Sequence, residues 1–125
     1  MSDITMGNRK VMVVDDDAAT RMGCRKLLVE NGIDVAEAAN GIEAISVYGD
    51  FRPDMVFMDI AMPGMDGLTA LQNIIVMDAK AKIAMAIVKG QQALVLEALQ
   101  TGAVDFVIKP FKQEQVLGII KKVLK

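Results

Sequence analysis

The chain has 125 residues and a formal net charge of −2; hydrophobic residues make up 53% of it, aromatic residues 4%, and histidine is absent. This length suits a single domain with an aliphatic core, to which the ten methionines are expected to contribute. The absence of histidine excludes histidine-based acid–base catalysis, Ser-His and Cys-His nucleophiles and histidine metal sites. A lone cysteine cannot form an internal disulfide, and no apolar run suits a membrane span or a secretory signal, so we expect a cytoplasmic protein.

Strand-like and helical patterns alternate along the chain. The predicted elements are, in order, strand 10–14, helix 18–31, strand 34–38, helix 42–49, strand 55–58, helix 68–77, strand 83–87, helix 91–101, strand 104–108 and helix 113–124. Most of these strands are unbroken apolar runs, which is typical of strands covered on both faces. The alternation predicts a parallel α/β sheet with right-handed crossovers.

The first predicted helix shows how its two ends and its buried face are expected to form. Asp17 can cap its N-terminus. Met22, Leu27 and Leu28 fall on one stripe, which we expect to face the core. The residues before the first strand, 1–8, are expected to be a frayed terminus of the single domain 1–125.

Acidic side chains concentrate in residues 1–79 and basic side chains in residues 80–125. This polarity argues against a general nucleic-acid binder, which would carry a concentrated basic excess. It would allow an acidic partner to dock on the C-terminal third, although ordinary surface charge explains the distribution equally well.

Charged side chains follow three of the predicted strands, at the edge where an open α/β sheet binds its ligands. These are Asp15, Asp16 and Asp17 after the first strand, Asp59 after the third and Lys109 after the fifth. Taken singly, each is more often a helix cap, a solvated strand end or a surface lysine than a functional residue. Together they predict a cluster of carboxylates, which repel one another unless a cation joins them.

The ligand types in this cluster indicate its chemistry. Only oxygen ligands are offered, which favours a hard ion such as Mg²⁺. A lysine beside such an ion can pair with a phosphoryl oxygen as a point charge. These parts support phosphoryl transfer onto a carboxylate, with the metal and the lysine stabilising the charge.

Three segments, VMVVDDD at 11–17, MVFMDIAMPGMDG at 55–67 and DFVIKPF at 105–111, occur in the order and spacing of a known family's signature blocks. From Lys10 to Lys125 the chain resembles the response-regulator receiver domain, in its CheY-like single-domain form. The resemblance implies a flavodoxin-like, doubly wound (βα)5 fold with a five-stranded parallel sheet of order 2-1-3-4-5, of which this family is a standard example.

The same resemblance assigns roles to single residues. Asp59 is implied to be the phosphoacceptor and a metal ligand, with Asp15 and Asp16 as the acidic pair and Asp16 as the closer Mg²⁺ ligand. The backbone carbonyl of Ala61 would complete the protein's share of the metal shell, and Lys109 would contact the phosphoryl group. Such a domain is no enzyme in the usual sense, although it would catalyse its own phosphorylation and dephosphorylation.

The chain departs from the family at the end of strand 83–87. The family carries there a Ser or Thr whose hydroxyl binds the phosphoryl group and draws the next loop inward, after which an aromatic residue of the fifth strand fills the vacated space. The aromatic residue is present as Phe106, but Ile87 occupies the hydroxyl position, and its neighbour Val88 is bulkier than usual. We therefore expect a domain that accepts phosphate but switches weakly or differently.

Two further positions correspond to those at which family members tune hydrolysis of the acyl phosphate. Ala61 cannot orient an attacking water, so we expect a fairly long-lived phosphoryl group. Lys89 would instead cover that group electrostatically. The resemblance also implies that the Lys109–Pro110 bond is cis.

The expected partners are a histidine kinase and a protein target, without nucleic acid or membrane. No DNA-binding segment follows Lys125, so we expect output through protein contacts, with chemotaxis as the favoured setting. The expected contact face is formed by helix 91–101, strand 104–108 and helix 113–124, around Leu94, Phe106, Lys112, Lys121 and Lys122.

Two alternative functions remain open. A pseudo-receiver would bind partners without phosphorylation; Ile87 supports it, and the complete aspartate–lysine set speaks against it. A haloacid-dehalogenase-type phosphatase would require the pattern D-x-D-x-T after the first strand. Asp15 and Asp17 fit that pattern, but Ala19 replaces the threonine, and the chain lacks a cap domain.

Overall fold

The computed structural model describes residues 8–124, in which strands and helices alternate. The expected fraying of residues 1–8 therefore falls, apart from Asn8, outside the described residues. The elements are β1 (Lys10–Val14), α1 (Ala18–Val29), β2 (Asp34–Ala38), α2 (Gly41–Phe51), β3 (Met55–Asp59), α3 (Gly67–Met77), β4 (Ile83–Ile87), α4 (Ala93–Thr101), β5 (Asp105–Ile108) and α5 (Gln113–Val123). No helix among residues 8–124 is long and apolar enough to span a bilayer.

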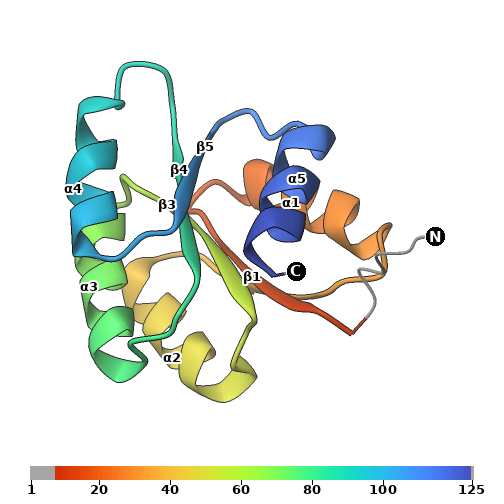
Figure 1. The fold of residues 1–125 in the computed structure, drawn as a ribbon, viewed down its shortest axis with the longest axis horizontal. Helices are drawn as coiled ribbons and strands as arrows, with labels where there is room; N and C mark the ends of the chain where they lie inside the picture. The colour runs from red at the N-terminus through yellow and green to blue at the C-terminus, as the bar shows by residue number, and fades with distance from the viewer. Residues whose placement is uncertain (1–7, 125) are drawn as a thin grey trace.

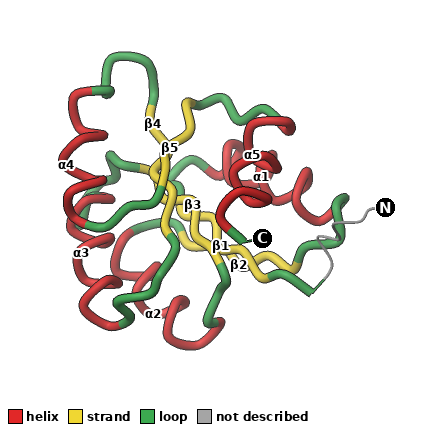
Figure 2. Tube along the Cα trace, viewed as in Figure 1, coloured by secondary structure: helices red, strands yellow, loops and turns green. Residues whose placement is uncertain are grey.

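The strands form one parallel sheet in the order β2-β1-β3-β4-β5, which confirms the expected topology. Figure 1 shows α1 and α5 on one face of the sheet and α2, α3 and α4 on the other. The trace in Figure 2 shows the strands running through the middle of these layers. Every residue of β3 and β4 is buried, because helices cover both faces of these strands.

Side chains that alternate along the strands fill two hydrophobic cores. Met12, Met58 and Ile83 belong to the core beneath α2, α3 and α4. Val13 and Phe57 belong to the core beneath α1 and α5. Because successive strand residues point to opposite faces, each short apolar run contributes to both cores.

The predicted core stripe of α1 is wrong at Met22, which is 64% exposed. The helix buries Cys24 and Leu28, which lie one turn apart on the same face. Two residues correspond to about 200° of rotation in an α-helix, so Met22 lies nearly opposite Cys24. Met77 is also exposed, so the methionines do not all enter the core.

The helix predicted from residue 91 begins two residues later, at Ala93. The side chain of Gln91 accepts a hydrogen bond from the Val88 N–H (2.9 Å), and that of Gln92 accepts one from the Gly90 N–H (2.7 Å). Gly90 has a φ of +103°, a conformation that favours glycine. These contacts close a turn between β4 and α4, so the two glutamines belong to the turn and not to the helix.

Candidate functional site

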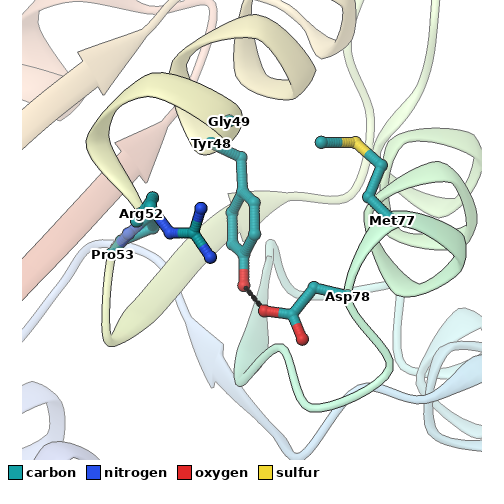
Figure 3. A pocket seen from close by; sticks show the side chains of 6 residues that line it. All are labelled: Tyr48, Gly49, Arg52, Pro53, Met77 and Asp78. Atoms are coloured by element: carbon teal, nitrogen blue, oxygen red, sulfur yellow. Dashed lines mark hydrogen bonds between the residues drawn. The ribbon is translucent and has the colours of Figure 1, made fainter.

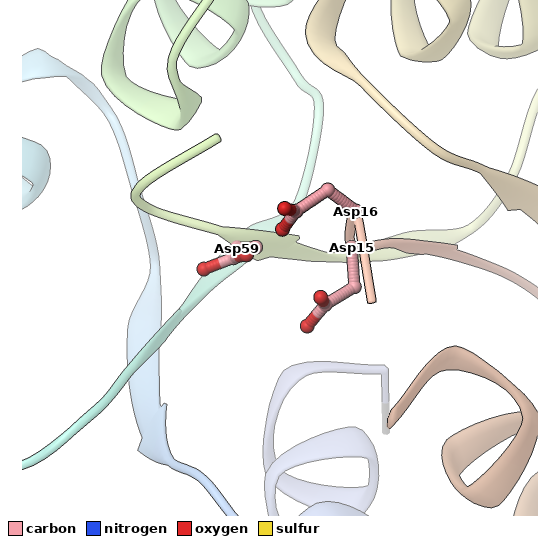
Figure 4. A group of neighbouring side chains, drawn as sticks. All are labelled: Asp15, Asp16 and Asp59. Carbon is pink, nitrogen blue, oxygen red and sulfur yellow. The ribbon is translucent and has the colours of Figure 1, made fainter. Parts of the chain in front are cut away.

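Three aspartates gather at the carboxyl ends of β1 and β3, as Figure 4 shows. One carboxylate oxygen from each of Asp15, Asp16 and Asp59 lies within 4.8 Å of the others. Magnesium–oxygen bonds of about 2.1 Å hold ligand oxygens no more than about 4.2 Å apart. A small side-chain movement or an intervening water would therefore fit these oxygens to Mg²⁺, and they are the hard donors that this ion prefers.

Asp15 is the most constrained member of the cluster, with 1% of its surface exposed. Its Oδ1 accepts a hydrogen bond from the Asp17 N–H at 2.9 Å, and its Oδ2 accepts one from Lys109 Nζ at 2.9 Å. Asp16 is exposed, and its carboxylate makes no hydrogen bond within residues 8–124. The two neighbours therefore differ: one carboxylate is held in place, and the other is free to bind a ligand.

Asp59 lies at the end of β3 and is 4% exposed. Its Oδ1 lies 3.3 Å from Lys109 Nζ and 3.4 Å from the backbone nitrogen of Ala61, so these contacts leave Oδ2 free. Burial, reinforced by the charge of Asp15, raises the pKa of Asp59 to about 6 despite the opposing effect of Lys109. A bound cation would oppose this rise, because a positive charge favours the ionised carboxylate.

Lys109 follows β5 and reaches both buried carboxylates. Burial by itself would lower its pKa, but the hydrogen bond to Asp15 and the charges of the two aspartates outweigh that effect and raise the pKa. The side chain is therefore a permanent cation at neutral pH, aimed between the ends of β1 and β3. The bond that follows, Lys109–Pro110, is cis, as expected.

Asp17 lies outside this charged cluster and caps α1, as predicted. Its carboxylate accepts from the Thr20 N–H at 2.8 Å. Hydrogen bonds from the Thr20 hydroxyl and backbone lower the pKa of Asp17. Its role in the structure is therefore that of a helix cap.

Gly67 is a residue that the sequence analysis missed. A Cβ placed on Gly67 would lie 2.1 Å from the backbone oxygen of Asp59, so α3 can begin this close to the site only with glycine there. The Gly67 N–H donates to the Ile60 carbonyl at 3.0 Å, which joins the helix start to the segment after Asp59. The sequence placed Gly67 between the predicted strand 55–58 and the predicted helix 68–77, but gave no sign of this close backbone contact.

The end of β4 has a different character from its neighbours. Ile87 is fully buried in the core beneath α2, α3 and α4, and Phe106 packs against the same core from β5. Val88 follows and is exposed. The described residues therefore place an apolar side chain where the family pattern has a hydroxyl.

The remaining sequence candidates lie at the surface. Ala61 is exposed beside Asp59, and Lys89 is exposed in the turn after β4. Within residues 8–124, Lys89 forms no ion pair with the aspartate cluster. The cover that Lys89 would give to a phosphoryl group on Asp59 stays a prediction.

The surface has one hollow beside the aspartate cluster and another far from it. One, of about 470 Å³, is lined by Asp16 together with Asn40, Ile42 and Met65. Another, of about 350 Å³, is shown in Figure 3 between the C-terminal ends of α2 and α3, where the Tyr48 hydroxyl donates to Asp78 at 2.8 Å. This second hollow lies at the amino end of the sheet, opposite the carboxylates, so it takes no part in their chemistry.

A parallel sheet of this order, with acidic side chains at the carboxyl ends of β1 and β3 and a lysine after β5, defines a receiver domain of two-component signalling. Residues 11–121 match the family described as "Response regulator receiver domain". The chain belongs to this family.

Several relatives have similar length. The chemotaxis protein CheY of Bacillus subtilis is 48% identical over 116 residues, which cover 92% of this chain and 97% of that protein. CheY of Thermotoga maritima is 45% identical, with 96% and 100% covered. The CheX–CheY–BeF3–Mg²⁺ complex of Borrelia burgdorferi contains a similar fold, with a TM-score of 0.87, 33% identity and coverage of 94% and 90%. Membership of this family removes the dehalogenase-type alternative.

Proposed function

We propose that this receiver domain accepts a phosphoryl group on Asp59 from the phosphohistidine of a histidine kinase, in a reaction that requires Mg²⁺. The observation that carries the proposal is the position of Lys109, whose Nζ lies 2.9 Å from Asp15 Oδ2 and 3.3 Å from Asp59 Oδ1. One cation thereby spans the ends of β1, β3 and β5, beside the exposed Asp16.

The transfer step forms one bond and breaks one. The free carboxylate oxygen of Asp59 attacks the phosphorus, a P–O bond forms, and the P–N bond breaks with its electron pair leaving on an imidazole already protonated at its other nitrogen. Lys109 pairs its ammonium with a phosphoryl oxygen. Asp15, Asp16, Asp59 and the carbonyl of Ala61 would hold the Mg²⁺ ion, which would neutralise part of the phosphoryl charge. The domain would not be an enzyme in the usual sense, although it would catalyse its own phosphorylation and dephosphorylation.

Intact-mass measurement with acetyl phosphate and Mg²⁺ tests the proposal. The native chain is expected to gain about 80 Da, the mass of one phosphoryl group. Asp59→Asn removes the nucleophile and is expected to show no gain, as is the native chain in excess chelator. A native chain that stays folded and never gains this mass would support the pseudo-receiver instead.

The pseudo-receiver remains a second candidate because of Ile87, which is fully buried and offers no donor to a phosphoryl group. A hydrogen bond to a charged group contributes roughly 1.5–3 kcal/mol. Driving a two-state switch from 1:99 to 99:1 requires about 5.5 kcal/mol of differential binding. Loss of the hydroxyl therefore removes between a quarter and a half of that drive, so we propose a phosphorylated domain with a weak or altered switch.

NMR with beryllofluoride, a mimic of the bound phosphoryl group, tests whether Ile87 weakens or alters the switch. The native chain is expected to show small shifts around Phe106, and Ile87→Thr larger ones in the same place. Ile87→Val is the matched control, because it changes the volume of the side chain without adding a hydroxyl. Equal and full shifts in the native chain and in Ile87→Thr would contradict the altered switch.

We further propose that the target docks on the face formed by α4, β5 and α5, in a chemotaxis pathway like those named for the CheY relatives. The exposed side chains of α4 include Leu94, Leu96 and Leu99, so this helix offers apolar surface to a partner. Lys122 forms an ion pair with Asp105, so its charge is already partly used within the domain. Lys112 and Lys121 are exposed and remain the better candidates for an acidic partner.

A further inference from the structure

Arg21 of α1 contacts the segment that carries the acidic pair. It lies outside the three signature blocks. Its Nη1 donates to the backbone carbonyl oxygen of Asp15 at 2.7 Å. Its Nε donates to Glu37 Oε1 on β2 at 3.0 Å. With its side chain 18% exposed, Arg21 is held between the end of β1 and the neighbouring strand.

The backbone around Asp15 is fixed on both sides. The Asp15 N–H donates to the Ala38 carbonyl at 3.1 Å, which extends the β1–β2 pairing by one bond. The Asp17 N–H turns back to Asp15 Oδ1 at 2.9 Å. Arg21 binds the remaining group, the carbonyl between Asp15 and Asp16, and therefore fixes the peptide plane from which the Asp16 side chain projects.

Glu37 determines the direction of the Arg21 side chain. A guanidinium has several donors in one rigid plane, so its Nε contact with Glu37 sets where Nη1 points. Arg25, one turn later, also reaches Glu37, at 3.5 Å, but its side chain is 53% exposed. Arg25 has no hydrogen bond to Asp15 within residues 8–124. The two arginines thus share a helix, a charge and an acidic partner, and differ in the contact with the acidic pair.

We propose that Arg21 is a positioning residue for the metal site, which holds the turn after β1 so that Asp15 and Asp16 face Asp59. This inference rests on the proposed Mg²⁺ dependence of the domain. Residues that orient metal ligands typically change metal affinity by about 10- to 100-fold when they are replaced. The contact here is to the backbone between two ligand residues, so we expect the lower end of that range.

The direction in which Mg²⁺ affinity changes when Arg21 is replaced distinguishes a positioning role from a simple effect of its charge. Arg21 is a cation near the carboxylates, and its charge contributes to lowering the pKa of Asp17. Removing a nearby positive charge makes a cation site more attractive, so charge alone predicts tighter Mg²⁺ binding when Arg21 is replaced. Loss of positioning predicts weaker binding.

The test is a titration of the full chain with Mg²⁺, in which amide NMR shifts and calorimetry both measure the binding affinity. Arg21→Met, which keeps the apolar stem, is expected to bind Mg²⁺ about tenfold more weakly than the native chain. Arg25→Met, the matched control, is expected to stay within about twofold. Arg21→Met binding Mg²⁺ as tightly as Arg25→Met, or more tightly, would overturn the proposal.

Two further variants keep the test decisive if Arg21→Met does not fold. Arg21→Lys keeps the charge but cannot span both partners, and is expected to lose several-fold in Mg²⁺ affinity, whereas a charge effect alone would leave it unchanged. Glu37→Gln keeps an acceptor for Nε and is expected to lose less. Native affinity in both variants would also overturn the proposal. A native chain that binds no Mg²⁺ would overturn both this inference and the proposed function, whereas the other outcomes affect this inference alone.

Discussion

The ends of β3 and β4 lie side by side in the sheet, with Asp59 opposite Ala86, yet they present opposite chemistry. The β3 end holds a buried carboxylate beside a lysine, with its pKa raised to about 6. The β4 end holds Ile87, which has no polar side-chain atom and is completely buried. The β3 end is expected to take part in phosphoryl transfer, and the β4 end is expected to signal that transfer has occurred. The residue at one end can therefore change without a change at the other, although the two ends are neighbours.

The largest expected effect comes from removing the cation that joins the strand ends. Lys109→Met leaves Asp15 and Asp59 without their shared partner, and we expect phosphorylation by acetyl phosphate to slow by roughly 100-fold, the usual effect of losing one charge-stabilising donor. Lys112→Met removes the same charge from a nearby exposed position and should stay near the native rate. Rates come from the growth of the phosphorylated mass. Equal rates for the two variants would show that the β3 end does not depend on this lysine.

The next effect concerns the stability of the metal-free protein. Because the pKa of Asp59 lies near 6 rather than 3.8, the folded chain binds the extra proton between these values, and its stability falls as pH rises through this window. Asp59→Asn should therefore stabilise the metal-free chain by about 2 kcal/mol near pH 7.5, with little gain near pH 4. Chemical denaturation at the two pH values measures this. A gain that does not depend on pH would contradict a titrating Asp59.

Replacing Ile87 should destabilise the protein, whereas Asp59→Asn should stabilise it. Ile87→Thr introduces a hydroxyl into a buried apolar position, and we expect a loss of about 1–2 kcal/mol in the unphosphorylated state. The rate of phosphorylation should change by less than about threefold, because transfer relies on charge stabilisation at the other strand ends. Denaturation and mass measurement on the same sample give both values. A large loss of rate would show that the two strand ends are coupled in the transfer itself.

The smallest effect should be on the lifetime of the phosphoryl group. Ala61→Asn places an amide beside Asp59, where it can orient an attacking water, and we expect dephosphorylation to become several-fold faster, a modest part of the usual effect of a positioned catalytic group. Ala61→Val is the control, since it adds bulk without a polar group. The decay of the phosphorylated mass after removal of the donor is the measurement. An unchanged decay in Ala61→Asn would rule out water orientation as the cause of a long lifetime.

Much of this arrangement is visible in the sequence because it follows from local patterns. An apolar run that ends in a charged residue places that residue at the edge of the sheet, which is how Asp15, Asp59 and Lys109 were found. Asp17 was predicted to be a cap because of its place before a helical pattern. Each of these inferences depends on residues close together in the chain, and the parallel sheet then brings the strand ends together.

The features that the sequence did not reveal depend on which face of a helix is buried, or on contacts between residues far apart in the chain. Met22 was placed on the wrong face because a short helix with few apolar residues fits more than one stripe. The need for glycine at position 67 arises from a backbone atom of Asp59 eight residues earlier. The contact of Arg21 with Glu37 joins a helix to a strand, and no local periodicity specifies such a pair.

One backbone contact links the ends of β4 and β5 independently of the side chain at Ile87. The Lys109 N–H donates to the Ile87 carbonyl oxygen at 2.7 Å, so the lysine and the end of β4 are tethered through their peptide groups. A main-chain tether persists through most side-chain substitutions. Mutation at position 87 can therefore alter which ligand the strand end recognises while leaving its mechanical attachment to Lys109 intact.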